Sequence, residues 1–221
     1  HILAPVSDVP EYAEKGVTPE NLNDYLTPFI KVGLNVSAFT ISLAGTGDRR
    51  WFEGKARHND GKPSENILRT IESLGQAGIQ VLRIGPFFVY SRDPEEAIEQ
   101  DKYAVEYYRR LVEQAEKFHV RLASHHWWLA GGEGEYAQGK RFLWNFETIK
   151  AFLDAVPSKY NGLLFCVGTF QSGGEDPVGA IREIGDKVVY VDARDARSVP
   201  NEFIRWDEDV WFTREGERTI N

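Results

Sequence analysis

Apolar, β-branched segments alternate with helical segments along most of this chain, and this alternation restricts its fold more than any other feature. The segments expected to be strands are short and rich in apolar residues; they are residues 2–4, 34–41, 79–84, 120–124, 163–167 and 187–191. The segments expected to be helices carry apolar residues at helical spacing; they are residues 18–32, 64–78, 93–115, 146–156 and 177–184. Strands separated by helices pair in parallel through right-handed crossovers, so the chain is predicted to be an α/β protein.

A parallel sheet of this kind is either open and doubly wound or closed into a (β/α)₈ barrel. An open nucleotide-binding sheet needs a glycine-rich phosphate turn after its first strand, and no predicted strand is followed by GxGxxG or GxxxxGK[ST]. The glycine-rich stretch at residues 131–134 contains Glu133, whose charge has the wrong sign for holding phosphate. We therefore predict a TIM barrel, a (β/α)₈ fold, in one domain that spans residues 1–221.

The sequence also indicates that this barrel lacks some of its segments. Only six strands are expected along the chain, whereas a full barrel has eight strands and roughly 250 residues. The chain contains no methionine, not even at position 1. We therefore expect that residues of the complete protein are missing from it.

The composition narrows the class of partner. The formal net charge is −8, from 34 acidic and 26 basic residues, which disfavours a nucleic acid. No apolar run approaches the roughly 20 residues that cross a bilayer, and the first residues do not resemble a secretory signal. The single cysteine, Cys166, cannot form an internal disulfide and fits a reducing compartment. These features predict a cytoplasmic protein that acts on a small molecule away from membranes, and they leave a homo-oligomer open.

Polar side chains occur where several predicted strands end, which is where the active site of a barrel is built. The residues at these ends are Arg83, His125 and His126, Cys166, and Asp192 with Arg194. Imidazole, thiolate and carboxylate groups supply nitrogen, sulfur and oxygen ligands to a divalent cation. We therefore predict an open metal site at His125, Cys166 and Asp192. A further carboxylate would come from the acidic segment at residues 207–209, which contains Asp207, Glu208 and Asp209.

Each of these residues also has an ordinary structural explanation. A cysteine in a strand is commonly a small buried apolar residue, and Asp192 could simply pair with Arg194. The meeting of several such residues at one mouth, rather than any single one, favours the metal site. Trp127 and Trp128, which follow the histidines, either stack on a sugar ring or pack on the rim of the barrel.

Two segments resemble the mannonate dehydratase family. Residues 160–169, YNGLLFCVGT, resemble the family's NGLTFCxGS segment, and residues 180–190, AIREIGDKVVY, resemble its AIREFGDRIHF helix. In the same register, residues 191–195, VDARD, correspond to the family's HLRN strand end. Less specifically, His125 matches the histidine of the family's HPDDP motif, and residues 206–210, WDEDV, resemble its GDVD segment. The likeness covers most of the chain, but only residues 160–195 carry specific motifs.

The resemblance implies a xylose-isomerase-like barrel and a Mn²⁺- or Fe²⁺-dependent reaction. That reaction dehydrates D-mannonate to 2-keto-3-deoxy-D-gluconate in glucuronate catabolism. Carried over position by position, the metal ligands would be His125, Cys166 and Asp209, with Asp192 where the family has a histidine. Arg194 matches the family's arginine and would bind the substrate carboxylate.

The chain departs from the family at two places in this site. The HPDDP motif reads HHWWL here, and Asp192 replaces a histidine, so another sugar acid or a sugar is also open as the substrate. In the dehydration, a divalent metal would stabilise the enediolate that forms when the proton next to the carboxylate is removed. Loss of the neighbouring hydroxyl then needs a general acid, for which the candidates are His126, Tyr136 and Asp207.

Other functions stay open on the same residues. A metal-dependent sugar isomerase or epimerase would move a proton without losing water, although Cys166 argues mildly against it because such sites favour Glu, Asp and His. A degenerate barrel that has lost part of its metal shell would bind a sugar without catalysis. Glycoside hydrolysis is a more distant alternative, in which Trp127, Trp128 and Glu133 would serve a saccharide.

Overall fold

The computed structural model describes residues 2–41, 62–85, 94–126, 143, 145–172 and 174–194. Its six strands form one sheet in the order β1-β2-β3-β4-β5-β6, and every neighbouring pair is parallel. The strands are β1 (Ile2–Pro5), β2 (Val36–Ile41), β3 (Val81–Ile84), β4 (Arg121–His125), β5 (Asn161–Cys166) and β6 (Val188–Asp192). Strand order that follows chain order is typical of a barrel wall, whereas a doubly wound sheet reverses its order at a switch point.

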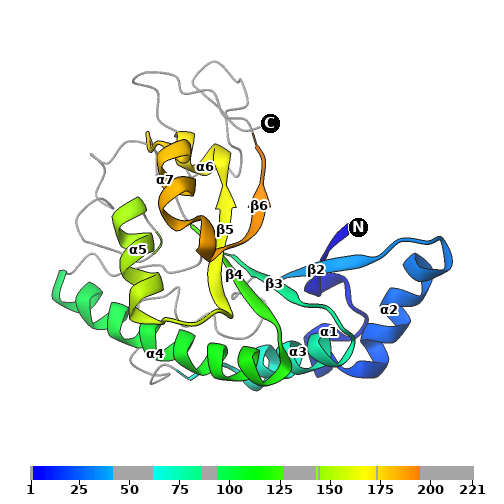
Figure 1. Ribbon diagram of the computed structural model, residues 1–221. Helices are drawn as coiled ribbons and strands as arrows, with labels where there is room; N and C mark the ends of the chain where they lie inside the picture. The colour runs from blue at the N-terminus through cyan, green and yellow to red at the C-terminus, as the bar shows by residue number, and fades with distance from the viewer. Residues whose placement is uncertain are drawn as a thin grey trace, which may run out of the picture.

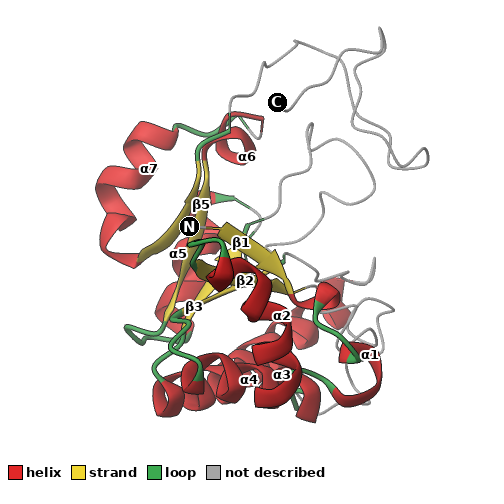
Figure 2. Ribbon diagram, turned by 90° about the vertical axis from the view of Figure 1, so that its right-hand side faces the viewer, coloured by secondary structure: helices red, strands yellow, loops and turns green. Residues whose placement is uncertain are grey.

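Helices connect the successive strands. They are α1 (Tyr12–Lys15), α2 (Pro19–Lys31), α3 (Glu65–Gln76), α4 (Pro94–Phe118), α5 (Phe146–Ala155), α6 (Val167–Ser172) and α7 (Pro177–Ile184), with 3₁₀ turns at Val6–Asp8 and Gly185–Lys187. Figure 1 shows α4 running beneath the sheet, with α5 and α7 beside β5. Figure 2 shows α3 and α4 packed next to each other on one side of the strands.

Polar side chains at the helix starts explain where several helices begin. Each accepts a hydrogen bond from a backbone N–H of the first turn, which would otherwise lack a partner. These capping residues are Thr18 before α2, Ser64 before α3, Asn145 before α5 and Asp176 before α7. The predicted helix starts at Thr18, Ser64 and Pro177 are confirmed.

The two faces of the sheet are covered differently. On the outer face, strand residues such as Leu82, Ile84, Leu163 and Phe165 pack against residues of α2, α3, α4, α5 and α7 in one large core. On the inner face, a smaller buried cluster contains only strand residues, namely Ala38, Val81, Ala123, Leu164 and Cys166. A barrel interior is filled in this way, by side chains from strands alone. The inner face therefore holds the side chains that converge on a barrel mouth.

The predicted barrel architecture is confirmed, with six strands in the described residues against the eight of a complete barrel. β1 and β6 are the two ends of the sheet in this part of the chain. Within the described ranges, no helix combines the length and the apolar character needed to cross a membrane. A single domain over residues 1–221 stays a prediction.

Candidate metal centre

Three of the four predicted metal ligands meet at the ends of three adjacent strands. His125 is the last residue of β4, Cys166 of β5 and Asp192 of β6. Their candidate ligand atoms all lie within 4.8 Å of one another. Ligand atoms around one tetrahedral cation are roughly 3.5 Å apart, given metal–ligand bonds of about 2.0–2.3 Å. The three groups are therefore close enough together to be candidate ligands of one ion.

The strand register explains this convergence. Cys166 pairs directly with Asp192 across β5 and β6, while His125 pairs with Leu164, two residues before Cys166. Side chains two residues apart in a strand lie on the same face, so all three side chains belong to the inner face of the sheet. The fourth predicted ligand, Asp209, lies outside the described residues.

Two polar atoms of this cluster fit the role of metal ligands. His125 Nδ1 and Asp192 Oδ2 are buried, and within the described part of the chain neither forms a hydrogen bond of good geometry, although Asp192 Oδ2 is ion-paired with Arg83. Buried side-chain nitrogen and oxygen atoms almost always have a partner, so such atoms in a cluster with a thiol are unusual. Nitrogen, sulfur and oxygen donors together suit a borderline divalent cation such as Zn²⁺ or Fe²⁺, while the carboxylate also suits the harder Mn²⁺. The residues present therefore fit a divalent metal.

The environment of His125 keeps its imidazole neutral near pH 7. The pKa of His125 falls from 6.5 to about 4. Burial is the main cause of this fall, the positive charge of Arg83 lowers the pKa further, and the negative charge of Asp192 raises it in part. A neutral imidazole is the form that binds a metal. His125 is thus ready to act as a ligand without first losing a proton.

His126 lies behind the cluster rather than in it. It is 2 % exposed, and its Nε2 accepts a hydrogen bond of 3.3 Å from the backbone N–H of Cys166. Its ring stacks on His125 with centroids 5.5 Å apart and contacts Phe170 at 4.4 Å. Burial, followed by the nearby His125, lowers the pKa of His126 to about 3. His126 therefore ties the end of β5 to the end of β4 and fixes the position of Cys166.

Two arginines approach the same oxygen of Asp192. Arg83 Nη2 lies 3.1 Å from Asp192 Oδ2, and Arg194 Nη2 lies 3.6 Å from it. The side chains of Arg83 and Asp192 are 17 % and 13 % exposed, while that of Arg194 is 44 % exposed. The inner ion pair is therefore shielded from water, and the outer one is partly screened.

The structure brings together most of the predicted site residues that it describes. His125, Cys166 and Asp192 meet, Arg194 lies at their edge, and His126 supports them from behind. The remaining candidates lie outside the described residues; they are Asp207, Glu208, Asp209, Tyr136, Trp127, Trp128 and Glu133.

Arg83 is the residue whose importance the sequence did not show. We expected it near a strand end but assigned it no partner. Its contact with Asp192 joins β3 to β6, which are separated by two strands in the sheet. A charged residue within the otherwise apolar strand VLRI was the signal that could have singled it out.

Comparisons with known proteins agree with this architecture. No family model matches the chain. Among curated proteins, a mannonate dehydratase from Saccharophagus degradans is 36% identical over 56 residues, which cover 25% of this chain and 14% of that protein. Among solved structures, mannonate dehydratase from Streptococcus suis serotype 2 superposes with a TM-score of 0.66 at 19% identity. That match covers 90% of this chain and 65% of the solved one, so this chain spans less than two thirds of either relative.

Two further solved structures extend the likeness. A xylose isomerase domain protein from Planctomyces limnophilus matches with a TM-score of 0.59 at 13% identity, covering 90% of this chain and 73% of that one. The IOLI protein, solved with a bound zinc atom, matches with a TM-score of 0.59 at 18% identity, covering 96% of this chain and 68% of that one. The resemblance to mannonate dehydratases seen in the sequence is thus matched in the structure, and the chain has the fold of xylose-isomerase-like TIM barrels.

Proposed function

We propose that this chain carries the metal site of a sugar-processing barrel enzyme, a divalent-metal-dependent sugar-acid dehydratase. The proposed reaction converts D-mannonate to 2-keto-3-deoxy-D-gluconate and water. The observation that carries the proposal is the convergence of His125, Cys166 and Asp192 at the mouth of the sheet. The likeness to two mannonate dehydratases, one in sequence and one in structure, supports this reaction over others.

The proposed metal is Mn²⁺ or Fe²⁺, held by His125, Cys166 and Asp192, with Asp209 as the fourth ligand that the sequence suggests. When bound, such a cation supplies Lewis-acid stabilisation of negative charge on the substrate's oxygens. This stabilisation matters because a carbon next to a carboxylate is a very weak acid. The buried position of Cys166, 1 % exposed, shields its sulfur from water and oxidants.

Residues around the metal site are proposed to bind the substrate, position Cys166 and supply the general acid. The half-exposed Arg194 would attract an anionic substrate toward the rim of the site, since a guanidinium pairs well with a carboxylate. His126 holds the backbone of Cys166 through Nε2, so its described contacts favour a positioning role over that of the general acid. Asp207 and Tyr136 stay candidates for that acid.

A sugar epimerase is the second candidate, because a D-tagatose 3-epimerase-like protein matches this fold with a TM-score of 0.60 at 15% identity. An epimerase and a dehydratase both remove a proton next to a carbon–oxygen group, and they differ in whether water then leaves. The products therefore distinguish the two functions.

The test is product analysis after incubation of the protein with Mn²⁺ or Fe²⁺ and D-mannonate. We expect a 2-keto-3-deoxy acid, which the periodate–thiobarbiturate reaction detects, and we expect none from Cys166→Ser under the same conditions. A panel of neutral ketohexoses tests the second candidate. Epimerised ketohexose together with unchanged D-mannonate would overturn the dehydratase proposal.

A further inference from the structure

Arg83 places a positive charge inside the mouth of the barrel. It lies in β3 between Leu82 and Ile84, whose side chains are fully buried in the outer core. Because side chains alternate along a strand, that of Arg83 belongs to the inner face, as the side chain of Val81 does. From there its guanidinium reaches past β4 and β5 to Asp192 on β6.

The guanidinium of Arg83 has more donors than the described residues use. A guanidinium carries five N–H donors, and the recorded partner of Arg83 within the described residues is Asp192 alone, at 3.1 Å. Asp192 Oδ2 forms no hydrogen bond of good geometry with it. The neighbouring residues in register on β2 and β4 are Thr40 and Ala123, which offer no carboxylate. Within the described residues, most of the donors of Arg83 are therefore left available to a ligand.

Among the described residues, the ion-paired group at Asp192 carries more positive than negative charge, although the whole chain is acidic. Arg83 and Arg194 both face the single carboxylate of Asp192, so two positive charges meet one negative charge. The chain as a whole carries a formal net charge of −8. A local positive centre with shielded guanidinium donors attracts an anion, and a planar carboxylate matches the guanidinium fork.

From this arrangement we infer that Arg83 is a specificity-determining residue that binds the carboxylate of the substrate and so selects sugar acids over neutral sugars. The inference rests on the proposed function, because it concerns the substrate of the same site. It assigns the inner carboxylate contact to the shielded Arg83 and leaves the more exposed Arg194 at the rim. Arg83 would keep its contact with Asp192 through one nitrogen while its other donors meet the substrate.

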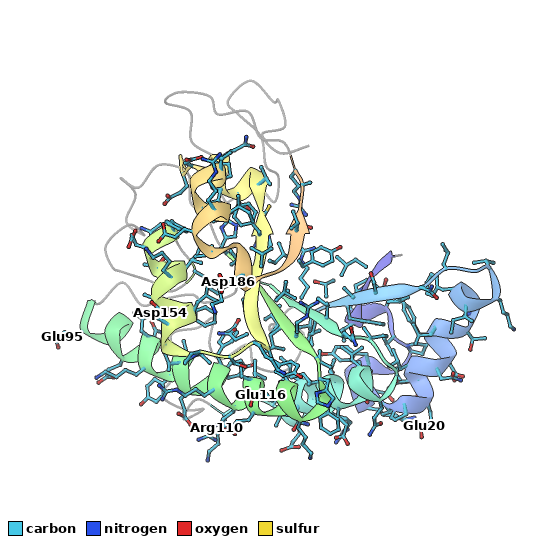
Figure 3. The ribbon with its side chains drawn as sticks, in the orientation of Figure 1. Glu20, Glu95, Arg110, Glu116, Asp154 and Asp186 are labelled. Carbon is cyan, nitrogen blue, oxygen red and sulfur yellow. The ribbon has the colours of Figure 1, made fainter. Side chains whose placement is uncertain are left out.

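The test compares aldonates with the alditols of the same configuration, because each pair differs only at the first carbon. Binding of D-mannonate against D-mannitol, and of D-gluconate against D-glucitol, is measured by calorimetry on the Mn²⁺-loaded protein. The variants are Arg83→Gln and Arg83→Lys. The matched control is Arg110→Gln, which removes the same charge on the outer side of α4, where Figure 3 labels it, away from the site.

We expect Arg83→Gln to weaken aldonate binding by about ten- to a hundredfold, the usual effect of losing hydrogen bonds to a charged group. Alditol binding should stay within about twofold of that of the unchanged protein. Arg83→Lys should recover part of the aldonate preference, and Arg110→Gln should keep all of it. A purely structural role would instead weaken both ligand classes together.

Three outcomes would overturn the inference. They are equal binding of aldonates and alditols by the unchanged protein, an unchanged preference in Arg83→Gln, and loss of the preference in Arg194→Gln alone. Failure of the proposed function has a different signature, namely a preserved aldonate preference without formation of a 2-keto-3-deoxy acid. Mn²⁺ binding and far-ultraviolet circular dichroism of each variant show whether the site and the fold are intact.

Discussion

Acid is expected to destabilise this fold through two buried histidines. His125 and His126 have an ordinary pKa of 6.5, and burial lowers these values to about 4 and about 3 in the folded protein. Between those values and 6.5, the unfolded chain binds protons that the folded chain does not. Stability therefore rises with pH across this window and is lost as the pH falls through it.

The size of the effect follows from the pKa differences. At about pH 4.5, two units below the unfolded pKa, each histidine lowers the free energy of unfolding by about 3 kcal/mol relative to about pH 8. His126→Gln removes one of these contributions, so its loss of stability between the two pH values should be smaller by about 3 kcal/mol. Carboxylates that titrate in the same range do so in both proteins and cancel in the difference.

Two substitutions at His126 separate its charge from its hydrogen bond. Glutamine offers an amide oxygen near the position of Nε2 and can accept the N–H of Cys166, whereas phenylalanine cannot. Both variants lack the titrating imidazole, so both should show the weaker pH dependence. At about pH 8, His126→Phe should be less stable than His126→Gln by about 1–3 kcal/mol, because the buried N–H loses its partner.

The assay is urea unfolding of the metal-free protein at several pH values between about 4.5 and 8, followed by circular dichroism. A pH dependence in His126→Gln equal to that of the unchanged protein would refute the argument from burial. Equal stability of His126→Phe and His126→Gln at about pH 8 would refute the role of the bond to Cys166.

Two further substitutions test the strand ends around the site. Gly162→Ala should destabilise the fold by about 1–3 kcal/mol, as measured by urea unfolding. The new Cβ would lie 2.5 Å from Val189 Cγ2 and closer still to the carbonyl oxygen of Lys187. Unchanged stability would mean that β5 and β6 are farther apart at this point. Asp192→Asn should weaken Mn²⁺ binding by more than about a hundredfold, because it removes a ligand charge and the carboxylate that Arg83 and Arg194 pair with. Calorimetry measures this loss, and an unchanged affinity would exclude Asp192 as a ligand.

The fold could largely be predicted because each local pattern agreed with the next. The expected strand at residues 163–167 corresponds to β5 (Asn161–Cys166), and the expected helix at 177–184 has the same bounds as α7. The helix α6 (Val167–Ser172) was not predicted, and the strand was extended into it. Val167 continues a run of four apolar residues at 163–166, and the next glycine, Gly168, comes only after it, so the local sequence does not mark the turn before Val167.

The residues at the strand ends of the site could be predicted from the sequence, whereas the contacts that long side chains make across the sheet could not. His125, Cys166 and Asp192 each follow an apolar run, and parallel strands bring such ends together. The contact between Arg83 and Asp192 depends on the curvature of the sheet across four strands, which no local pattern encodes. The burial of His126 was also hidden, because one polar residue after a strand looks the same whether it faces the mouth or the core.

The central claim, that His125, Cys166 and Asp192 hold a divalent cation, is tested most directly by calorimetric titration of the chelator-treated protein with Mn²⁺. We predict one binding site per chain and an affinity that falls by more than about a hundredfold in Cys166→Ser, which replaces the sulfur ligand with little change in volume. Absence of Mn²⁺ binding, or equal affinity in the unchanged protein and Cys166→Ser, would contradict the claim.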